Sequence, residues 1–325
     1  MAVPTLSKHG ARAGSGLGDQ PGPGGRGRRP RKAMSEGLAG YLFLLPWFVG
    51  LLVIVLGPMV ASLYLSFTDY NPLGSPEWVG LENYARLGED PRYLKSVGVT
   101  ATYVLVSVPL QLAFALLLAL LLDKGLRGLA FYRSVFYLPS LLGTSVAIAL
   151  LWRQVFGGRG LLNQVLRAVG VDNPPSWIAN PDTAVYTLVA LAVWMFGAPM
   201  IIFLAGLRQI PTMYYEAAAV DGAGALRRFF SITLPLLTPV IFFNLVLQMI
   251  GAFQAFTPAY VISDGLGGPV DSTLFYTLYL YQEGFTSFRM GYASAMAWVL
   301  LGVIAIFTAL QFLVSRFWVF YGDER

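Results

Sequence analysis

The stretch from Leu38 to Phe67, LAGYLFLLPWFVGLLVIVLGPMVASLYLSF, decides the fold class of this chain, because its 30 residues include no charged side chain. A helix needs about 20 apolar residues to cross the hydrocarbon core of a bilayer. The apolar core of a cleaved signal peptide is shorter, at about 7–15 residues. The stretch therefore predicts a membrane-spanning helix that is retained in the mature protein.

Five more charge-free runs follow along the chain, and each has about the length of a membrane span. They cover Ser96–Leu122, Ser134–Trp152, Thr183–Leu207, Phe229–Ser263 and Met290–Ser315. The fifth run of the six is overlong, and Pro235 is expected to separate an approach segment from the span proper. Lipid cannot satisfy unpaired backbone amides, so the spans must be helices. The sequence predicts an all-α, polytopic membrane protein with six transmembrane helices over residues 38–325.

The overall composition excludes most enzyme classes. Of the 325 residues, 56% are hydrophobic and 12% are charged, about half the charged fraction of a soluble domain. There is no Cys, and His9 is the one His. Disulfides, thiolate or histidine metal sites and Ser-His-Asp triads are thereby excluded. We expect no catalytic residue, no metal and no cofactor.

Residues 1–37 differ from the rest because they are rich in Gly, Pro and basic side chains and show no apolar periodicity. They are predicted to form a disordered basic tail. A cytoplasmic tail places 15 of the 22 Lys and Arg on the cytoplasmic side, in agreement with the positive-inside rule. Both termini are therefore predicted to be cytoplasmic. We expect the charge of the tail to serve topology at the membrane and not to bind nucleic acid. Contact of the tail with anionic membrane lipid is the alternative.

The six runs contain no ionisable residue, whereas proton- or ion-coupled carriers normally carry one inside the membrane. Neutral polar residues are the candidates for a solute path: Gln111, Asn244, Gln248 and Gln254. Asn244 and Gln248 are four residues apart and share a helix face. Trp194 is a candidate to stack on a pyranose ring. Hydrogen bonding between helices is the alternative role for the amide side chains.

The segment IPTMYYEAAAVDGAGALRRFFSITLPLLTP, from Ile210 to Pro239, lies between the fourth and fifth runs. Its composition predicts a helix capped by Thr212, a turn at Asp221-Gly222 and a second short helix from about Ala225. Small side chains allow another protein to approach closely. The segment is therefore either a docking site for a partner or an ordinary surface loop.

At these residues the chain resembles a known family. Glu216-Ala217-Ala218, Asp221-Gly222-Ala223 and Pro235 are similar to the EAA loop of ABC-importer permeases, the membrane subunits of binding-protein-dependent uptake systems. Other stretches resemble the carbohydrate-uptake branch, which includes the maltose and glycerol-3-phosphate permeases: Gly80–Tyr84, Phe131–Arg133, Leu138–Pro139, Trp152–Arg153, Gly160–Asn163 and Met290–Ala295. The resemblance extends from about Leu38 to the C-terminus. It departs at Val99, where the family often has Asn.

The resemblance implies a division of labour in a bacterial-type plasma membrane. Such a permease forms half of a translocation pathway and pairs with a second, related permease as a heterodimer. Two ATP-binding subunits hydrolyse ATP, and an extracytoplasmic solute-binding protein delivers a sugar or oligosaccharide. This chain has no GxxxxGK[ST] phosphate loop, so ATP hydrolysis is expected in the partner.

For the loop itself, residues of about 208–235, the resemblance implies a cytoplasmic coupling loop. Glu216 would be the charged contact to the ATP-binding subunit, and Ala217 and Ala218 would form the close-contact surface. Gly222 would be the hinge between the two helices of the loop.

Two other functions stay open at this stage. A secondary carrier for a small neutral solute would act without an ATPase, but it would be expected to show an internal repeat and an intramembrane ionisable residue. A membrane scaffold without transport could use the loop, but it has no need of the polar face formed by Asn244 and Gln248. Co-isolation with an ATPase would favour the importer.

Overall fold

The computed structural model describes residues 36–124, 128–143 and 145–320. The predicted basic tail lies outside the described residues, except for Glu36 and Gly37, which begin helix α1 (Glu36–Gly50). The chain divides into two units, Met1–Leu56 and Gly57–Arg325. In the first unit, α1 is followed by the π-helical segment η1 (Leu51–Leu56).

The second unit is built almost entirely from helices that follow the charge-free runs. Its longer helices are α2 (Gly57–Leu65), α4 (Pro91–Asp123), α5 (Leu129–Leu142), α6 (Val146–Phe156), α8 (Ala184–Trp194), α9 (Gly197–Leu207), α12 (Leu234–Phe253) and α15 (Met290–Trp318). Shorter elements connect them: β1 (Thr68–Asp69), β2 (Glu77–Trp78), α3 (Glu82–Glu89), α7 (Leu161–Ala168), α10 (Thr212–Val220), α11 (Ala225–Arg228), η2 (Phe229–Thr233), α13 (Thr257–Ile262), η3 (Pro269–Asp271), α14 (Tyr276–Tyr281) and η4 (Gln282–Thr286). The predicted all-α class is confirmed.

Four helical segments of the described chain are long and apolar enough to cross a membrane by themselves. They are Gly40–Leu65, Pro91–Asp123, Ala225–Phe253 and Met290–Trp318. Two further pairs qualify only when a bend is allowed: α5 with α6–α7, bent by 94°, and α8 with α9, bent by 43°. The chain therefore has four to six candidate spans, and the number six stays a prediction.

The expectation for Pro235 was wrong. Residues Ala225–Phe253 form one helical segment, and Pro235 lies in the first turn of α12. The turn before it, η2, is π-helical. A wider turn of this kind accommodates an irregularity inside a helix without ending it, so the proline does not separate an approach segment from the span.

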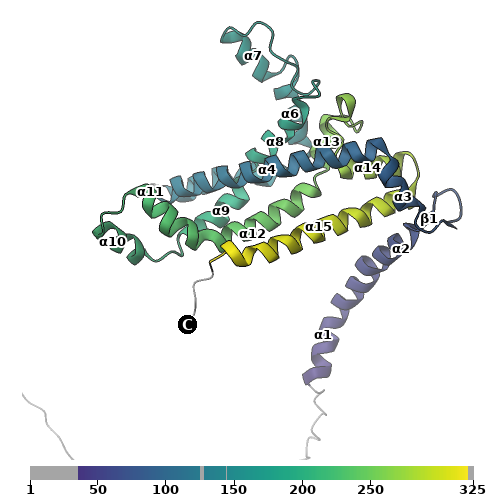
Figure 1. Cartoon of the computed structure of the whole chain (residues 1–325), viewed down its shortest axis with the longest axis horizontal. Helices are drawn as coiled ribbons and strands as arrows, with labels where there is room; N and C mark the ends of the chain where they lie inside the picture. Colours follow the sequence, from purple (N-terminus) through teal and green to yellow (C-terminus); the bar gives the residue numbers. More distant parts are fainter. Residues whose placement is uncertain (1–35, 125–127, 144, 321–325) are drawn as a thin grey trace, which may run out of the picture. The chain divides into compact units, whose positions relative to one another are not determined.

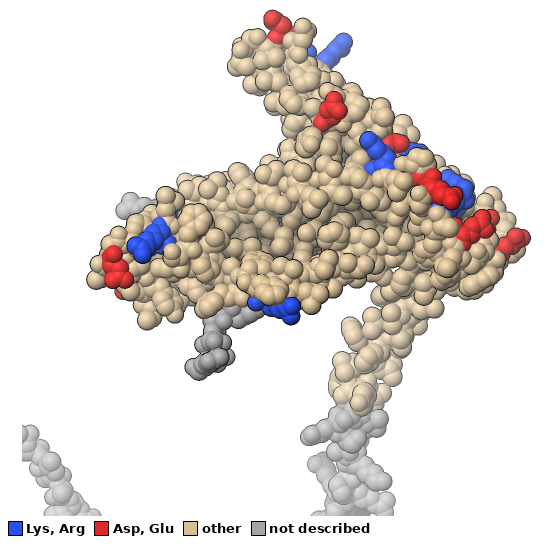
Figure 2. Space-filling model, viewed as in Figure 1, with Lys and Arg blue, Asp and Glu red and all other residues tan. Residues whose placement is uncertain are grey.

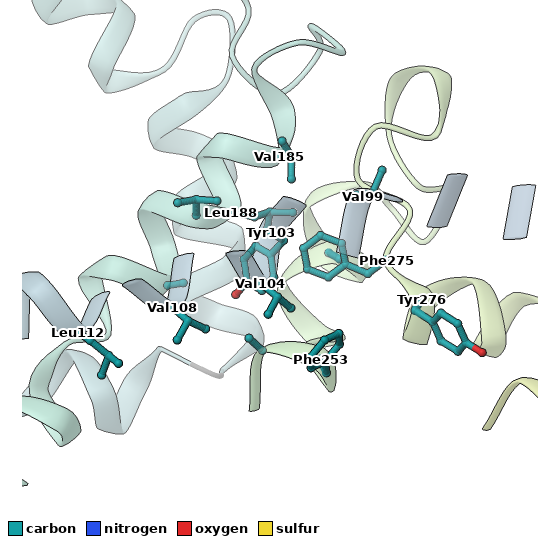
Figure 3. Packing of buried hydrophobic residues seen from close by; sticks show 14 of the residues in the cluster. Val99, Tyr103, Val104, Val108, Leu112, Val185, Leu188, Phe253, Phe275 and Tyr276 are labelled. Carbon is teal, nitrogen blue, oxygen red and sulfur yellow. The ribbon is translucent and has the colours of Figure 1, made fainter. Parts of the chain in front are cut away.

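Helix α4 is central to the second unit and packs against α8, α9 and α12 (Figure 1). Its buried side chains recur every three or four residues, as expected for one helix face: Val104, Val108, Leu112, Ala115 and Ala119. Figure 3 shows Val104 and Val108 among the side chains of this core. The ring of Tyr103 lies 4.6 Å from that of Phe275, between their centroids. The core thus joins α4 to the segment before α14.

Charged side chains avoid the middle of the long helices. On the face shown in Figure 2, Lys, Arg, Asp and Glu gather near the helix ends and on the segment that projects beyond α6. The surface between them is uncharged, as hydrocarbon contact requires.

Gly291, near the start of α15, lies where the helix meets β1. A Cβ atom at this position would lie 2.0 Å from the carbonyl oxygen of Thr68. The backbone N–H of Gly291 also donates to the carbonyl of Tyr70, with the N and O atoms 3.2 Å apart. Only glycine permits this approach.

We therefore expect Gly291→Ala to lower the free energy of unfolding by about 2 kcal/mol, the typical cost of overpacking. The matched control is Gly302→Ala in the same helix, where an added Cβ meets nothing within 4 Å. It should be neutral or slightly stabilising, because Ala is the better helix former. Thermal unfolding of the purified protein measures both, and equal midpoints would contradict the close approach.

Candidate functional site

A cavity of about 460 Å³ lies between α4, α5, α8–α9, α12 and α13. None of the fifteen described residues that line it is Asp, Glu, Lys or Arg. Its polar groups are amides and hydroxyls: Tyr103, Ser107, Gln111, Ser140, Gln248, Gln254 and Thr257. The lining can therefore exchange hydrogen bonds with a polar solute without offering it a charge.

Helical spacing explains how two walls of the cavity arise. Tyr103, Ser107 and Gln111 follow one another at intervals of four on α4, so they share a face. On α12, Gln248 and Gly251 are three residues apart and also share a face. Because Gly251 has no side chain, it leaves space in the cavity next to the amide of Gln248.

The structure brings together three of the five residues predicted for the solute path. Gln111, Gln248 and Gln254 line the cavity. Asn244 is fully buried instead, and its Nδ2 donates to the carbonyl of Val240 at 3.2 Å. Trp194 is outside the cavity lining, and its ring centroid lies 5.7 Å from that of Trp152.

The predicted loop forms two helices joined by a tight turn. Helix α10 ends in a Schellman motif, in which Ala223 N–H donates to the Ala218 carbonyl and Gly222 N–H to the Ala219 carbonyl. Gly222 has φ +73°, the left-handed conformation that glycine adopts without strain. Thr212 is the first residue of α10, and the cap position belongs to Pro211. The expected Thr212 cap was therefore wrong, whereas the turn at Asp221-Gly222 is confirmed.

The loop presents an exposed face at one end of the helices (Figure 1). Glu216, Ala217 and Asp221 are exposed on it. Large apolar side chains around them are also exposed: Met213, Tyr214, Val220, Leu226 and Phe230. The hydroxyl of Tyr215 hydrogen-bonds Thr233 Oγ1 at 3.0 Å and ties α10 to the helix that follows. The result is an anchored helix with an apolar and acidic outward face.

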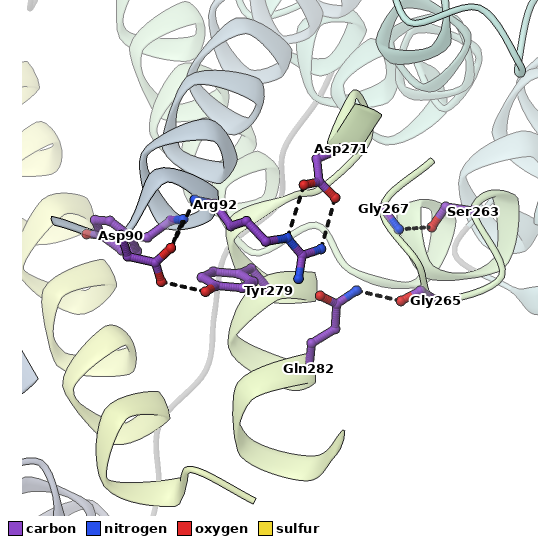
Figure 4. A network of polar contacts seen from close by, with 9 residues as sticks. Asp90, Arg92, Ser263, Gly265, Gly267, Asp271, Tyr279 and Gln282 are labelled. Atoms are coloured by element: carbon purple, nitrogen blue, oxygen red, sulfur yellow. Dashed lines mark hydrogen bonds and ion pairs between the residues drawn. The ribbon is translucent and has the colours of Figure 1, made fainter. Parts of the chain in front are cut away.

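A polar network joins the Pro91 end of α4 to α14 and α15 (Figure 4). Asp90 caps α4, and its Oδ2 accepts from the hydroxyls of Tyr279 at 2.5 Å and Tyr292 at 2.8 Å. Arg92 donates to both carboxylate oxygens of Asp271, at 3.0 and 2.9 Å. Such bidentate pairs fix geometry as well as charge. The network therefore holds three segments in register at this end.

Comparison with known proteins identifies the chain. Residues 89–319 match the model of the family described as binding-protein-dependent transport system inner membrane component. The chain belongs to this family. The permease is thus a multi-pass plasma membrane protein and the membrane subunit of an ATP-driven importer. In these systems a separate subunit hydrolyses ATP, and a solute-binding protein takes part.

Curated relatives agree with this assignment. The permease is 52% identical over 299 residues to the probable ABC transporter permease protein YesP of Bacillus subtilis, covering 92% of this chain and 97% of the relative. It is 33% identical to the lactose transport system permease protein LacF of Rhizobium radiobacter, covering 85% and 94%. The family assignment also decides against a secondary carrier that works without an ATPase.

A solved structure has the same fold. The permease matches a chain of the bacterial alginate ABC transporter in complex with an alginate pentasaccharide-bound periplasmic protein, with a TM-score of 0.75. The match covers 86% of this chain and 94% of the other, at 22% sequence identity.

Sequence reasoning missed several residues of the permease's cavity and the whole polar network. For Ser107 the spacing of four from Tyr103 and Gln111 was an available signal. For Ser140 nothing in α5 distinguishes it from other small polar residues. The charged residues of the network entered the sequence analysis only through the positive-inside rule. Asp90 and Arg92 are too far from Asp271 in sequence to suggest that they belong to one network.

The ionisation of two carboxyl groups is shifted at this end of the permease: that of Asp90 in the network and that of Glu283, which pairs with Arg289. Burial alone would raise the pKa of Asp90, but hydrogen bonds from Tyr279, Tyr292 and two backbone N–H groups outweigh it and hold the pKa below its usual value. Burial raises the pKa of Glu283, whose side chain is only 3% exposed, against the opposing effect of its ion pair with Arg289.

The lowered pKa of Asp90 predicts a pH-dependent effect of Tyr279→Phe. Because the folded pKa lies below the ordinary value of 3.8, the stabilisation is present above that pH and is lost as the pH falls through the folded pKa. The variant should lose about 2 kcal/mol of unfolding free energy near pH 7, the contribution of a hydrogen bond to a charged group. The loss should shrink below pH 3.8.

The matched control is Tyr281→Phe in the same helix, whose hydroxyl makes no hydrogen bond to a described residue. Unfolding midpoints of the wild type and both variants over a pH series measure the effect. A difference for Tyr279→Phe that does not change with pH would contradict the role of Asp90.

Proposed function

We propose that the permease forms half of the translocation pathway for a sugar or oligosaccharide delivered by the extracytoplasmic solute-binding protein. The observation that carries this proposal is the cavity of about 460 Å³ lined by amides, hydroxyls and aromatic rings without a charged side chain. Sugars are recognised by hydrogen bonds that fix their orientation within a mostly apolar site. The cavity has this composition.

The names of the relatives support a carbohydrate as the solute. Besides the lactose permease protein LacF, the chain is 34% identical to the arabinooligosaccharides transport system permease protein AraP of Bacillus subtilis. It is 35% identical to the sn-glycerol-3-phosphate transport system permease protein UgpA of Salmonella typhimurium.

In this proposal Gln248 and Gln254 contact the solute directly. Asn244 and Trp194 do not contact the solute and instead support the residues that line the cavity. Asn244 is buried in α12, and Trp194 packs against Trp152. The cavity is only one half of the pathway, and a second, related permease supplies the other half in a heterodimer.

The loop of residues 208–235 is proposed to dock in the ATP-binding subunits. The exposed Glu216 supplies the charged contact, and Ala217, Ala218 and Ala223 supply a surface of small side chains. Two ATP-binding subunits, one for each permease, then act on Asp221-Gly222 as a hinge. Pro235 lies in the first turn of α12, within the helical segment that follows this turn. This arrangement places the loop and both termini in the cytoplasm, with six spans, as the positive-inside rule favours.

Reconstitution of the permease with its sibling, the ATPase and the binding protein in liposomes tests the proposed function. Lactose, arabinooligosaccharides and sn-glycerol 3-phosphate are the solutes to supply. We expect ATP-dependent uptake, and Gln248→Leu should lower apparent affinity about tenfold, because a solute hydroxyl is left unpaired.

Leu247→Ala is the control on the same helix, because Leu247 is exposed and does not line the cavity. Uptake without the ATPase, or no uptake of any of the three, would count against the proposal.

The loop generates a separate expectation. Gly222→Ala places a Cβ on a residue with φ +73°, which costs about 1–2 kcal/mol. Substrate-stimulated ATPase activity of the assembled complex should fall several-fold. Gly224→Ala is the matched control, since Gly224 lies two residues on with φ −68° and open space around it. If both variants stay fully coupled, the docking role of the turn is wrong.

A further inference from the structure

The helix α8–α9 is interrupted beside the cavity, and its sequence explains why. Helix α8 ends at Trp194 and α9 begins at Gly197, with a bend of 43°. In an unbroken helix the carbonyl of Met195 would accept from the residue four positions on. That residue is Pro199, which has no backbone N–H. In lipid an unpaired carbonyl is costly, so Met195 needs a donor from elsewhere in the protein.

Two side chains from neighbouring helices provide the missing donors. Gln111 Nε2 of α4 donates to the Met195 carbonyl at 3.0 Å, and Ser140 Oγ of α5 donates to the same oxygen at 2.9 Å. Ser140 Oγ also accepts from the backbone N–H of Ala198 at 2.9 Å. One hydroxyl therefore joins Met195, the residue that follows α8, to the first turn of α9. We call Gln111 and Ser140 the latch.

The latch lies in the cavity wall. Gln111, Ser140, Met195 and Ala198 all line the cavity, so a solute that fills it meets the hydrogen bonds that hold the break. On the far side of the break, α9 runs to Leu207, and the chain then enters α10 of the loop at Thr212. The break thus separates the cavity from the loop along one short stretch of chain.

We propose that Gln111 and Ser140 are positioning residues that set the tilt of α9, and that a solute hydroxyl in the cavity competes for the Met195 carbonyl and releases this setting. Occupancy of the cavity is then transmitted through α9 to the loop. The transmission step rests on the proposed function, whereas the mechanical role of the latch does not.

The mechanical role is tested by spin labels on the assembled complex. The chain contains no Cys, so Leu121→Cys at the far end of α4 and Met213→Cys on α10, both exposed, give one labelled pair in the permease. The complex is assembled from partner subunits in which any Cys has been replaced. We expect Ser140→Ala and Gln111→Ala each to broaden or shift the distance distribution, and Ser140→Thr, which keeps the hydroxyl, to restore it. Ser134→Ala is the matched control, because Ser134 Oγ donates to Ala130 within α5.

The coupling role is tested by ATPase activity with and without the loaded binding protein, using the three solutes named above. Ser140→Ala should lower the stimulation ratio about fivefold, as expected for one hydrogen bond. The double variant with Gln111→Ala should be less than additive, because both side chains hold one carbonyl.

The outcomes separate the two proposals. If a solute stimulates the wild type but the latch variants show unchanged distances and unchanged stimulation, the latch is wrong and the proposed function stands. A wild type that no solute stimulates would count against the proposed function, and the distance distributions would still decide the mechanical role. If Ser140→Ala does not assemble, Gln111→Ala gives the same readouts.

Discussion

Every backbone group that leaves its helical partner inside a membrane must find a new one within the protein, because lipid supplies none. In the permease this constraint acts most directly at Met195, because the residue that would donate to its carbonyl in an unbroken helix is Pro199. The donors that satisfy it must be polar side chains in an apolar bundle. The break therefore brings an amide and a hydroxyl into the interior, beside Gln248 and Gln254. The uncharged hydrogen-bonding cavity and the interrupted helix have a common physical cause.

At the turn around Gly222, the backbone carbonyls at the end of a helix also need donors, and here the backbone itself supplies them. There α10 ends outside the candidate spans, and its last carbonyls accept from the backbone N–H groups of the Schellman motif. No side chain is required, so the outward face of α10 is free for Glu216 and the apolar residues around it.

The charge-free runs were enough to locate the helices, because the period and the absence of charge are local properties of the sequence. They did not predict the bends. Pro199 was visible inside the fourth run, but its effect depends on whether another helix supplies a donor. In the candidate site, too, some residues could be predicted from local sequence and others could not. Gln248 and Gln254 were detectable as polar residues in an apolar run, whereas Asn244 shares the spacing and still bonds to Val240. Ser134 and Ser140 are indistinguishable in sequence, and only packing gives Ser140 its two partners.

The geometry also explains how a small change at the break becomes a larger one at the loop. Helix α9 has 11 residues, so it is about 16 Å long, and a tilt of about 10° at the break displaces its far end by about 3 Å. Such a tilt needs a fixed reference, which α4 provides. Asp90 and Arg92 hold its Pro91 end to α14, α15 and Asp271, and Gln111 contacts the break from the same helix. Packed helices move as rigid bodies between discrete arrangements. The anchored α4 is therefore the frame against which α9 turns. The two helices pack against each other, and the ion pair of Arg208 with Asp123 joins their far ends. The latch fixes α9 to this frame at the break.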